Sequence, residues 1–305
     1  MLLITFSPAA MLLYERGNVD LLIFFICAMA ILMIEYSSLA AAVIILLGAL
    51  LKIFPIFALV IFFEKKWKLL WKNVLFVITS FAIYSWITFS NIQASWNLTM
   101  RGKSISYGVN ILFTRYHNSF LAMLKKISPV FDYDSLLAIL PHLVGLAVLV
   151  AVLVISLRTH SIPSSRNSRN LAAFRMGAFI YIGTFLLGNN WDYRLTFLLF
   201  TIPQLTDWIY TEKGKHRFLV LLTISLIIIS CWHFIFVKWF SLIISNPEVA
   251  IIFDEVANWS LFAVLAYLSF ISLPQWVKEI VRNPIKGFRL ASLRESGTNF
   301  LELVE

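Results

Sequence analysis

The sequence predicts an all-α protein, a polytopic bundle of transmembrane helices, on three observations. Of the 305 residues, 60% are apolar and only 13% are charged, whereas a soluble domain carries about 25% charged residues. The apolar residues gather in blocks, such as 136–157 and 218–237, that contain no Asp, Glu, Lys or Arg. Each block matches the roughly 20 residues that cross a bilayer. The blocks do not alternate polar and apolar residues as membrane β-strands do, so helices must satisfy their backbone within lipid.

About eight spans follow from these blocks, with predicted bounds 17–34, 38–63, 70–89, 136–156, 171–188, 195–210, 218–237 and 258–277. The sequence has no internal repeat and no stretch with the composition of a water-soluble domain. Residues 1–277 are therefore predicted to form a single transmembrane bundle with an external loop at 91–134. Helical spacing over 109–126 predicts an interfacial helix within that loop.

The basic residues follow the second, fourth, sixth and eighth spans, which strict alternation places on one side of the membrane. The positive-inside rule makes that side cytoplasmic. The basic tail 278–305 is then cytoplasmic, the loops at 91–134 and 188–194 are external, and the protein is a multi-pass protein of the plasma (inner) membrane. This distribution explains the net charge of +9 without a nucleic-acid partner. Cys27 and Cys231 lie inside apolar spans, so no disulfide, metal site or cofactor is expected.

The beginning of the chain is unusual. Residues 1–6 are apolar but too short to span, and Ser7 and Pro8 have the chemistry of a helix N-cap and first helical residue. A short apolar stub before such a cap resembles the last turn of a span. This predicts that the chain is an N-terminal truncation of a longer protein.

Lys52 is a lysine deep in the predicted second span. A cation at mid-helix costs at least about 2.5 kcal/mol on insertion scales, so it needs an explanation. One interpretation is that Lys52 snorkels, or pairs with backbone freed by the nearby Pro55. The other is that it faces a polar cavity that holds a lipid phosphate. The residue types favour neither.

Asp192 and Arg194 lie at the predicted outer mouth, beside Trp191 and Tyr193. The planar fork of an arginine binds two oxygens of a phosphate at once. Asp192 is then the partner of Arg194, or a ligand for a sugar hydroxyl or a metal. The alternative is an interfacial anchor, which is common at span ends. The carboxylate favours the functional interpretation, because an anchor gains little from it.

Further candidates are weaker. Arg101, Lys103 and His117 in the long external loop are possible phosphate ligands, while an isolated histidine such as His117 or His233 is more often structural. The polar stretch 14–20, which lies at the predicted inner end of the first span, is best interpreted as a glycine turn between two helices. The sequence contains none of the motifs G-x-x-x-x-G-K, G-x-G-x-x-G, H-E-x-x-H or G-x-S-x-G, so an ATP-driven pump is not expected.

Several short stretches together resemble the polyprenol-phosphate-mannose-dependent mannosyltransferases of glycosyltransferase family 87. They are S-P at 7–8, R-G-N-V-D at 16–20, L-K-I-F-P at 51–55, K-K-W-K at 65–68 and N-W-D-Y-R-L at 190–195. The similarity covers about 7–72 and 188–205. It implies the C-type glycosyltransferase fold and transfer of a sugar from a polyprenyl-phosphate donor outside the cytoplasm. It also implies a catalytic acidic residue in the first external loop, to which no position here corresponds.

These observations lead to three hypotheses. The first is a membrane hexosyltransferase, or the C-terminal part of one, that uses a polyprenyl-phosphate sugar donor and a glycan or lipid acceptor. Its catalytic residue is unknown, and its expected substrate-binding residues are Asp192, Arg194, Arg101, Lys103, His117 and Lys52. The second is a transporter or flippase for a lipid-linked or anionic solute, which usually shows repeated halves with broken helices at matching positions. The third is an inactive fragment.

Overall fold

The protein is a helical bundle with six helices long and apolar enough to cross a membrane, counted over the part of the chain that the structure describes. The structure is a computed structural model that describes residues 1–98, 106–126, 133–159, 168–188, 190–243, 247–283 and 285. The all-α prediction is confirmed, and the chain is a multi-pass membrane protein. The six helices are α3 (Val19–Tyr36), α5 (Trp67–Ile87), α9 (Tyr133–Arg158), α10 (Ser168–Leu187), α12 (Gly214–Ile243) and α13 (Pro247–Ile271).

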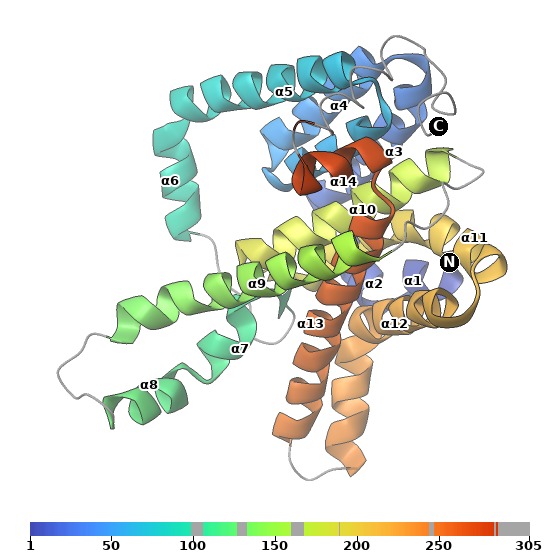
Figure 1. Ribbon diagram of the computed structural model, residues 1–305. Helices are drawn as coiled ribbons and strands as arrows, with labels where there is room; N and C mark the ends of the chain where they lie inside the picture. The colour runs from blue at the N-terminus through green and yellow to red at the C-terminus, as the bar shows by residue number, and fades with distance from the viewer. Residues whose placement is uncertain are drawn as a thin grey trace.

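Shorter elements complete the bundle (Figure 1). They are α1 (Leu2–Thr5), α2 (Pro8–Glu15), α4 (Ser38–Leu51), α6 (Phe89–Leu98), α7 (Asn110–Arg115), α8 (His117–Lys125), α11 (Ile202–Thr211), α14 (Gln275–Arg282), the 3₁₀-helices η1 (Phe54–Glu64) and η2 (Asp192–Thr201), and the strands β1 (Ser106–Tyr107) and β2 (Asn190–Trp191). The helical prediction for 109–126 is confirmed by α7 and α8, which meet at Tyr116.

Helix α10 forms the centre of the bundle, with 78% of its spanning stretch buried. Two glycines let its neighbours approach closely. A Cβ on Gly177 would lie 2.8 Å from the Phe197 carbonyl oxygen of η2, and one on Gly183 would lie 2.3 Å from the Phe57 ring of η1. Both 3₁₀-helices therefore pack directly on α10. They are long for a geometry usually limited to short runs, so tertiary packing must hold them.

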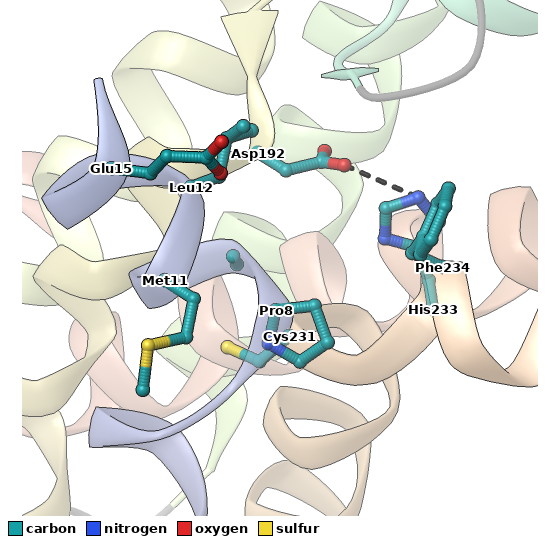
Figure 2. A pocket seen from close by; sticks show the side chains of 9 residues that line it. Pro8, Met11, Leu12, Glu15, Asp192, Cys231, His233 and Phe234 are labelled. Carbon is teal, nitrogen blue, oxygen red and sulfur yellow. Dashed lines mark ion pairs between the residues drawn. The ribbon is translucent and has the colours of Figure 1, made fainter.

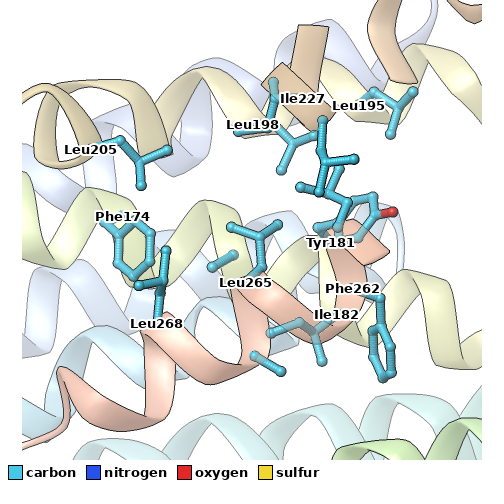
Figure 3. Packing of buried hydrophobic residues seen from close by; sticks show 14 of the residues in the cluster. Phe174, Tyr181, Ile182, Leu195, Leu198, Leu205, Ile227, Phe262, Leu265 and Leu268 are labelled. Atoms are coloured by element: carbon cyan, nitrogen blue, oxygen red, sulfur yellow. The ribbon is translucent and has the colours of Figure 1, made fainter. Parts of the chain in front are cut away.

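The main apolar core surrounds α10 on the side of η2, α12 and α13. Phe174, Tyr181 and Ile182 of α10 meet residues from the other three segments (Figure 3). Ring pairs contribute, with the Phe185 and Phe262 rings stacked at a centroid distance of 4.6 Å. Burial of this apolar surface fixes the relative positions of the elements that carry the polar residues described below.

The predicted second span, 38–63, is wrong as a single helix. Helix α4 ends at Leu51, Lys52 is extended (φ −151°, ψ 144°), and η1 begins at Phe54. A Cβ on Gly48 would lie 3.3 Å from the Pro55 Cβ, whereas residues seven apart in a straight helix are about 10.5 Å apart along the axis. The chain therefore folds back at Lys52. Pro55 accounts for the break, because proline lacks an N–H and disfavours a helical residue before it.

This fold-back changes the orientation of the first span. Helices α3 and α4 form a hairpin at Ser37, whose hydroxyl accepts a hydrogen bond of 3.2 Å from the Ala40 amide. Glu35 at the end of α3 pairs with Arg169, and Glu64 at the end of η1 pairs with Arg175. We name this side of the bundle the basic end, and the opposite side the site end. The stretch 14–20 begins α3 at the site end, so its prediction at the inner end, beside the basic loops, is wrong.

Candidate functional site

The site end brings together the stretch 16–20, Lys52 and the stretch 190–195. Gly17 has a φ of +52°, which supplies the turn between α2 and α3, as the sequence predicts. Asn18 then caps α3, since its side-chain oxygen accepts a hydrogen bond of 3.1 Å from the Asp20 amide. The cap fixes Asp20 in the first turn of α3, where its side chain is fully buried. Local sequence therefore positions a buried carboxylate here.

Asp20 is the centre of an ion-pair cluster. Its Oδ1 lies 2.5 Å from the Lys52 Nζ, and its Oδ2 lies 3.2 Å from the Arg194 Nε. Lys52 also donates a hydrogen bond of 3.1 Å to the Asn18 side chain. Lys52 therefore has two polar side-chain partners, as the cost of an isolated cation at this depth requires. One carboxylate serves two cations, so the Asp20 cluster (Asn18, Asp20, Lys52 and Arg194) carries one positive charge in excess.

Aromatic rings surround the cations. The Arg194 guanidinium lies 5.0 Å from the centroid of Phe54, and the Lys52 ammonium 5.8 Å from that of Tyr193. Arg16, one turn before Asp20, lies 5.0 Å from the ring of Trp191. Such contacts stabilise a cation by about 0.5–2 kcal/mol, more where water is excluded. Arg16 is therefore a third cationic group beside the cluster.

A short strand pair holds the segment that carries Arg194. β1 and β2 are antiparallel, with Ser106 opposite Trp191 and Tyr107 opposite Asn190. Asn190 accepts a hydrogen bond from Arg194 and donates one to the Thr184 carbonyl of α10. Just beside the strands, the backbone crosses itself at two glycines. A Cβ on Gly108 would lie 1.4 Å from the Gly188 carbonyl oxygen. The long loop is therefore fastened to the Arg194 segment.

Asp192 faces away from the Asp20 cluster. Its Oδ2 lies 3.2 Å from the Nε2 of His233 on α12, while the His233 Nδ1 lies 3.3 Å from the Ser230 carbonyl oxygen. The interpretation of Asp192 as the ion partner of Arg194 is therefore wrong, since Arg194 pairs with Asp20. Asp192 lies outside the six spanning helices, and burial raises the pKa of its carboxyl to about 7, against the opposing effect of His233.

A cavity of about 270 Å³ lies between α2 and the Asp192–His233 pair (Figure 2). Met11, Leu12 and Phe234 form apolar parts of its wall. Glu15, Asp192 and His233 supply the polar groups. An apolar cavity with a few polar side chains at one place is typical of small-ligand sites. This cavity is called the α2 cavity below.

The structure describes four of the six predicted site residues, and these four lie in three places. Lys52 and Arg194 come together through Asp20, and Asp192 joins His233. His117 does not belong to either group, because it pairs with Asp134 at 2.9 Å in a second cavity between α7–α8 and α9. Arg101 and Lys103 lie outside the described residues. Among the residues that are described, no group of three or more His, Cys, Asp or Glu is placed to hold a metal.

Asp20 is the functional candidate that sequence reasoning missed. The glycine turn predicted for residues 14–20 is correct for Gly17, but it does not explain the buried carboxylate of Asp20. The sequence signal for Asp20 is an acidic residue two positions after the N-cap residue and followed by an uninterrupted apolar run. An acidic residue in the first turn is also favourable to any helix, so the signal did not distinguish the two roles.

Comparison with known proteins gives one match. A sequence model of glycosyltransferase family 87 matches residues 1–188, which is more than half of the chain and includes Asp20 and Lys52. Arg194 and the Asp192–His233 pair lie beyond the matched region. No curated protein and no solved structure matches the chain.

Proposed function

The chain belongs to glycosyltransferase family 87 and is a membrane glycosyltransferase, and we propose that it takes its sugar from a polyprenyl-phosphate donor. The acceptor is a glycan or lipid, and transfer takes place at the site end. The Asp20 cluster binds the phosphate of the donor. This proposal joins the family to the position and charge of the cluster.

The observation that carries it is the uncompensated positive charge. Lys52 and Arg194 share the single buried carboxylate of Asp20, and their side chains keep 25% and 19% exposure respectively. A polyprenyl phosphate presents an anion on a long apolar chain. It is matched by partly accessible cations among apolar helices, and the guanidinium of Arg194 offers a geometry that suits phosphate oxygens.

The cluster supports the bond-breaking step through charge. An acceptor hydroxyl attacks the anomeric carbon, the bond from that carbon to the phosphate oxygen breaks, and the hydroxyl proton passes to a base. Negative charge grows on the departing phosphate, so Arg194 and Lys52 favour the transition state by electrostatics. Direct attack inverts the configuration of the sugar carbon. Asp192 lies two residues before Arg194, and it can hold a proton because burial raises the pKa of its carboxyl.

Sidedness follows from the basic end. It carries Lys65 and Arg169, and the positive-inside rule places such residues in the cytoplasm. The tail is then cytoplasmic and the site end external, in the plasma membrane. Because of the fold-back at Lys52, α4 and η1 run between the two ends of the bundle in opposite directions, where the sequence predicts a single span. Since α3 also runs opposite to its predicted direction, Lys65 still lies at the basic end, and the assignment does not change.

Donor binding by the protein in lipid nanodiscs tests the proposal, with a fluorescent polyprenyl-phosphate hexose as the probe. A charge-assisted hydrogen bond contributes about 1.5–3 kcal/mol, so Arg194→Ala should weaken binding by about one to two decades. Arg194→Lys keeps the charge but loses the fork, and should weaken binding less. Arg282→Ala is the matched control, because this arginine is half-exposed at the basic end and pairs only locally with Glu279.

Equal donor affinity of Arg194→Ala and the parent protein would contradict the assignment of the phosphate site. The same protein, reconstituted into sealed vesicles, distinguishes the transferase from the transporter hypothesis. A transferase consumes donor and produces a glycosylated acceptor, whereas a flippase moves the labelled lipid between leaflets with its sugar intact.

A further inference from the structure

A second cavity, of about 540 Å³, lies between α7–α8 and the first turns of α9. We infer that this α9 cavity binds the neutral saccharide of a glycan acceptor, an inference that rests on the proposed glycosyltransferase function. Its volume lies within the range of about 300–1,000 Å³ usual for small-ligand sites. Polar side chains supply the wall on the α7–α8 side and at the start of α9. They are Asn110, Thr114, Arg115, His117, Asn118 and Asp134.

The chemistry of these side chains suits hydroxyl groups better than anions. A sugar hydroxyl both donates and accepts, so its binding site needs donors and acceptors close together. Asn110, Thr114 and Asn118 provide both. Asp134 adds a negatively charged acceptor that repels phosphate. Arg115 adds a positive charge, so the cavity contains charges of both signs. The Asp20 cluster, by contrast, has an excess of positive charge.

The cavity also has an apolar side. Phe113, Leu137 and Pro141 contribute to its wall. The ring of Phe113 is stacked on that of Phe120, with centroids 5.5 Å apart, which holds its orientation. A pyranose ring presents C–H groups on its faces and hydroxyls around its edge. One apolar surface opposite several polar groups therefore matches a sugar ring more closely than a small ion.

Hydrogen bonds connect the floor of the cavity to the segment that carries the donor site. Asn110 Nδ2 lies 3.2 Å from the Nε2 of His142, whose Nδ1 lies 2.9 Å from the Leu186 carbonyl oxygen at the end of α10. β1, directly before α7, pairs with β2, directly before Asp192 and Arg194. The α9 cavity and the Asp20 cluster are therefore held by the same short strand pair. A two-substrate enzyme needs such a fixed relation between acceptor and donor.

His117 has a positioning role in this arrangement. It begins α8, and its Nε2 lies 2.9 Å from Asp134 Oδ1 at the start of α9. The preceding residue, Tyr116, donates a hydrogen bond to Glu248 at the start of α13. Both contacts hold α8 against the bundle, so the cavity is formed before a ligand arrives. Pre-formed sites bind more tightly because less ordering is needed.

Direct saccharide binding tests the inference without requiring transfer. The parent protein in nanodiscs is examined by saturation-transfer difference NMR with methyl hexosides and methyl dihexosides as probes. We expect saturation transfer to at least one disaccharide. Asp134→Asn and Asn118→Ala should each weaken its affinity by about tenfold, the effect of losing one hydrogen bond of about 1.4 kcal/mol. Ser119→Ala is the matched control, because Ser119 lies on α8, is exposed and does not line the cavity.

The outcomes separate this inference from the proposed function. Absence of saturation transfer in the parent, or unchanged affinity in both cavity variants, would overturn it. Displacement of the disaccharide by millimolar inorganic phosphate would also overturn it, since it would indicate an anion site. Donor affinity measured on the same variants should not change, which also shows that they are folded. Saccharide binding that persists when the parent binds no polyprenyl-phosphate donor would retain the cavity assignment and reject the donor proposal.

Discussion

Replacing Asp20 with asparagine tests whether the carboxylate holds the site end together. Asparagine keeps the size of the side chain and removes its charge. The Asp20 carboxylate is fully buried and contacts both Lys52 and Arg194, at 2.5 Å and 3.2 Å. In the variant, two cations would share a neutral amide with a single acceptor oxygen. Their mutual repulsion would no longer be compensated.

The expected loss can be worked from the exposure of the partners. Removing one partner of a buried ion pair typically costs about 3–5 kcal/mol. The side chains of Lys52 and Arg194 keep 25% and 19% exposure, so water screens part of the repulsion. We therefore expect Asp20→Asn to reduce the free energy of unfolding by about 3 kcal/mol, at the lower end of that range. Lys52→Met in the Asp20→Asn background removes one of the two cations, so the double variant should lose less than the sum of the single variants, by about 1–3 kcal/mol.

Equilibrium unfolding in mixed micelles, driven by SDS and followed by far-ultraviolet circular dichroism, measures these differences. Asp207→Asn is the matched control. Asp207 accepts a hydrogen bond of 2.8 Å from neutral Asn170, a bond that an asparagine oxygen can also accept. This control should change the free energy of unfolding by less than about 1 kcal/mol. The reasoning is refuted if Asp20→Asn is as stable as Asp207→Asn, or if the effects of the Asp20 and Lys52 substitutions simply add.

Two further predictions concern the loop crossing and the sidedness. Gly108→Ala should destabilise the protein by at least about 2 kcal/mol and weaken donor binding, because a Cβ there lies 1.4 Å from the Gly188 carbonyl oxygen at a φ of +133°. Gly214→Ala is the control that separates backbone strain from this collision, because Gly214 has a φ of +54° and nothing lies within 4 Å of its Cβ position. A cysteine at Ser119 should react with an impermeant thiol reagent in intact cells, and a cysteine at Lys215 should not. Both positions are exposed, but they lie at opposite ends of the bundle. Equal labelling would reject the external position of the site end.

The sequence predicts the helical class and most spans because each depends on a local property. Length and apolar composition decide that 218–237 and 136–156 cross the membrane, and α12 and α9 contain these ranges. The fold-back at Lys52 is different. Pro55 predicts an interruption of the helix, but a proline is equally compatible with a kinked span and with a reversal of the chain. The reversal depends on Gly48 meeting Pro55 across the turn and on α10 accepting η1 at Gly183, and the second is a contact between segments far apart in the sequence.

The candidate site was predictable to the extent that isolated charges are costly in an apolar chain. Lys52 and Arg194 stand out for that reason, and both lie in the Asp20 cluster. Their common partner could not be deduced, because its position in the first turn of a helix already has a sufficient local explanation. The same limit applies to His233. Its sequence surroundings are those of a structural histidine, and only the packing of α12 against η2 places it beside Asp192.

The break at Lys52 also bears on the choice between a transferase and a transporter. Transporters use broken helices at the substrate site, and their mechanism requires parts of the bundle to rock or open around it. Here η1 is held at both ends. At the site end, the Phe54 ring lies beneath Arg194. At the basic end, Glu64 pairs with Arg175, a side chain only 1% exposed, which also donates a hydrogen bond to the Ser272 carbonyl after α13. Moving η1 would separate Glu64 from Arg175, and leaving the buried Arg175 charge uncompensated costs several kcal/mol. The break therefore fixes Lys52 beside Asp20, as a preorganised phosphate site requires, and favours chemistry at a stationary centre over alternating access.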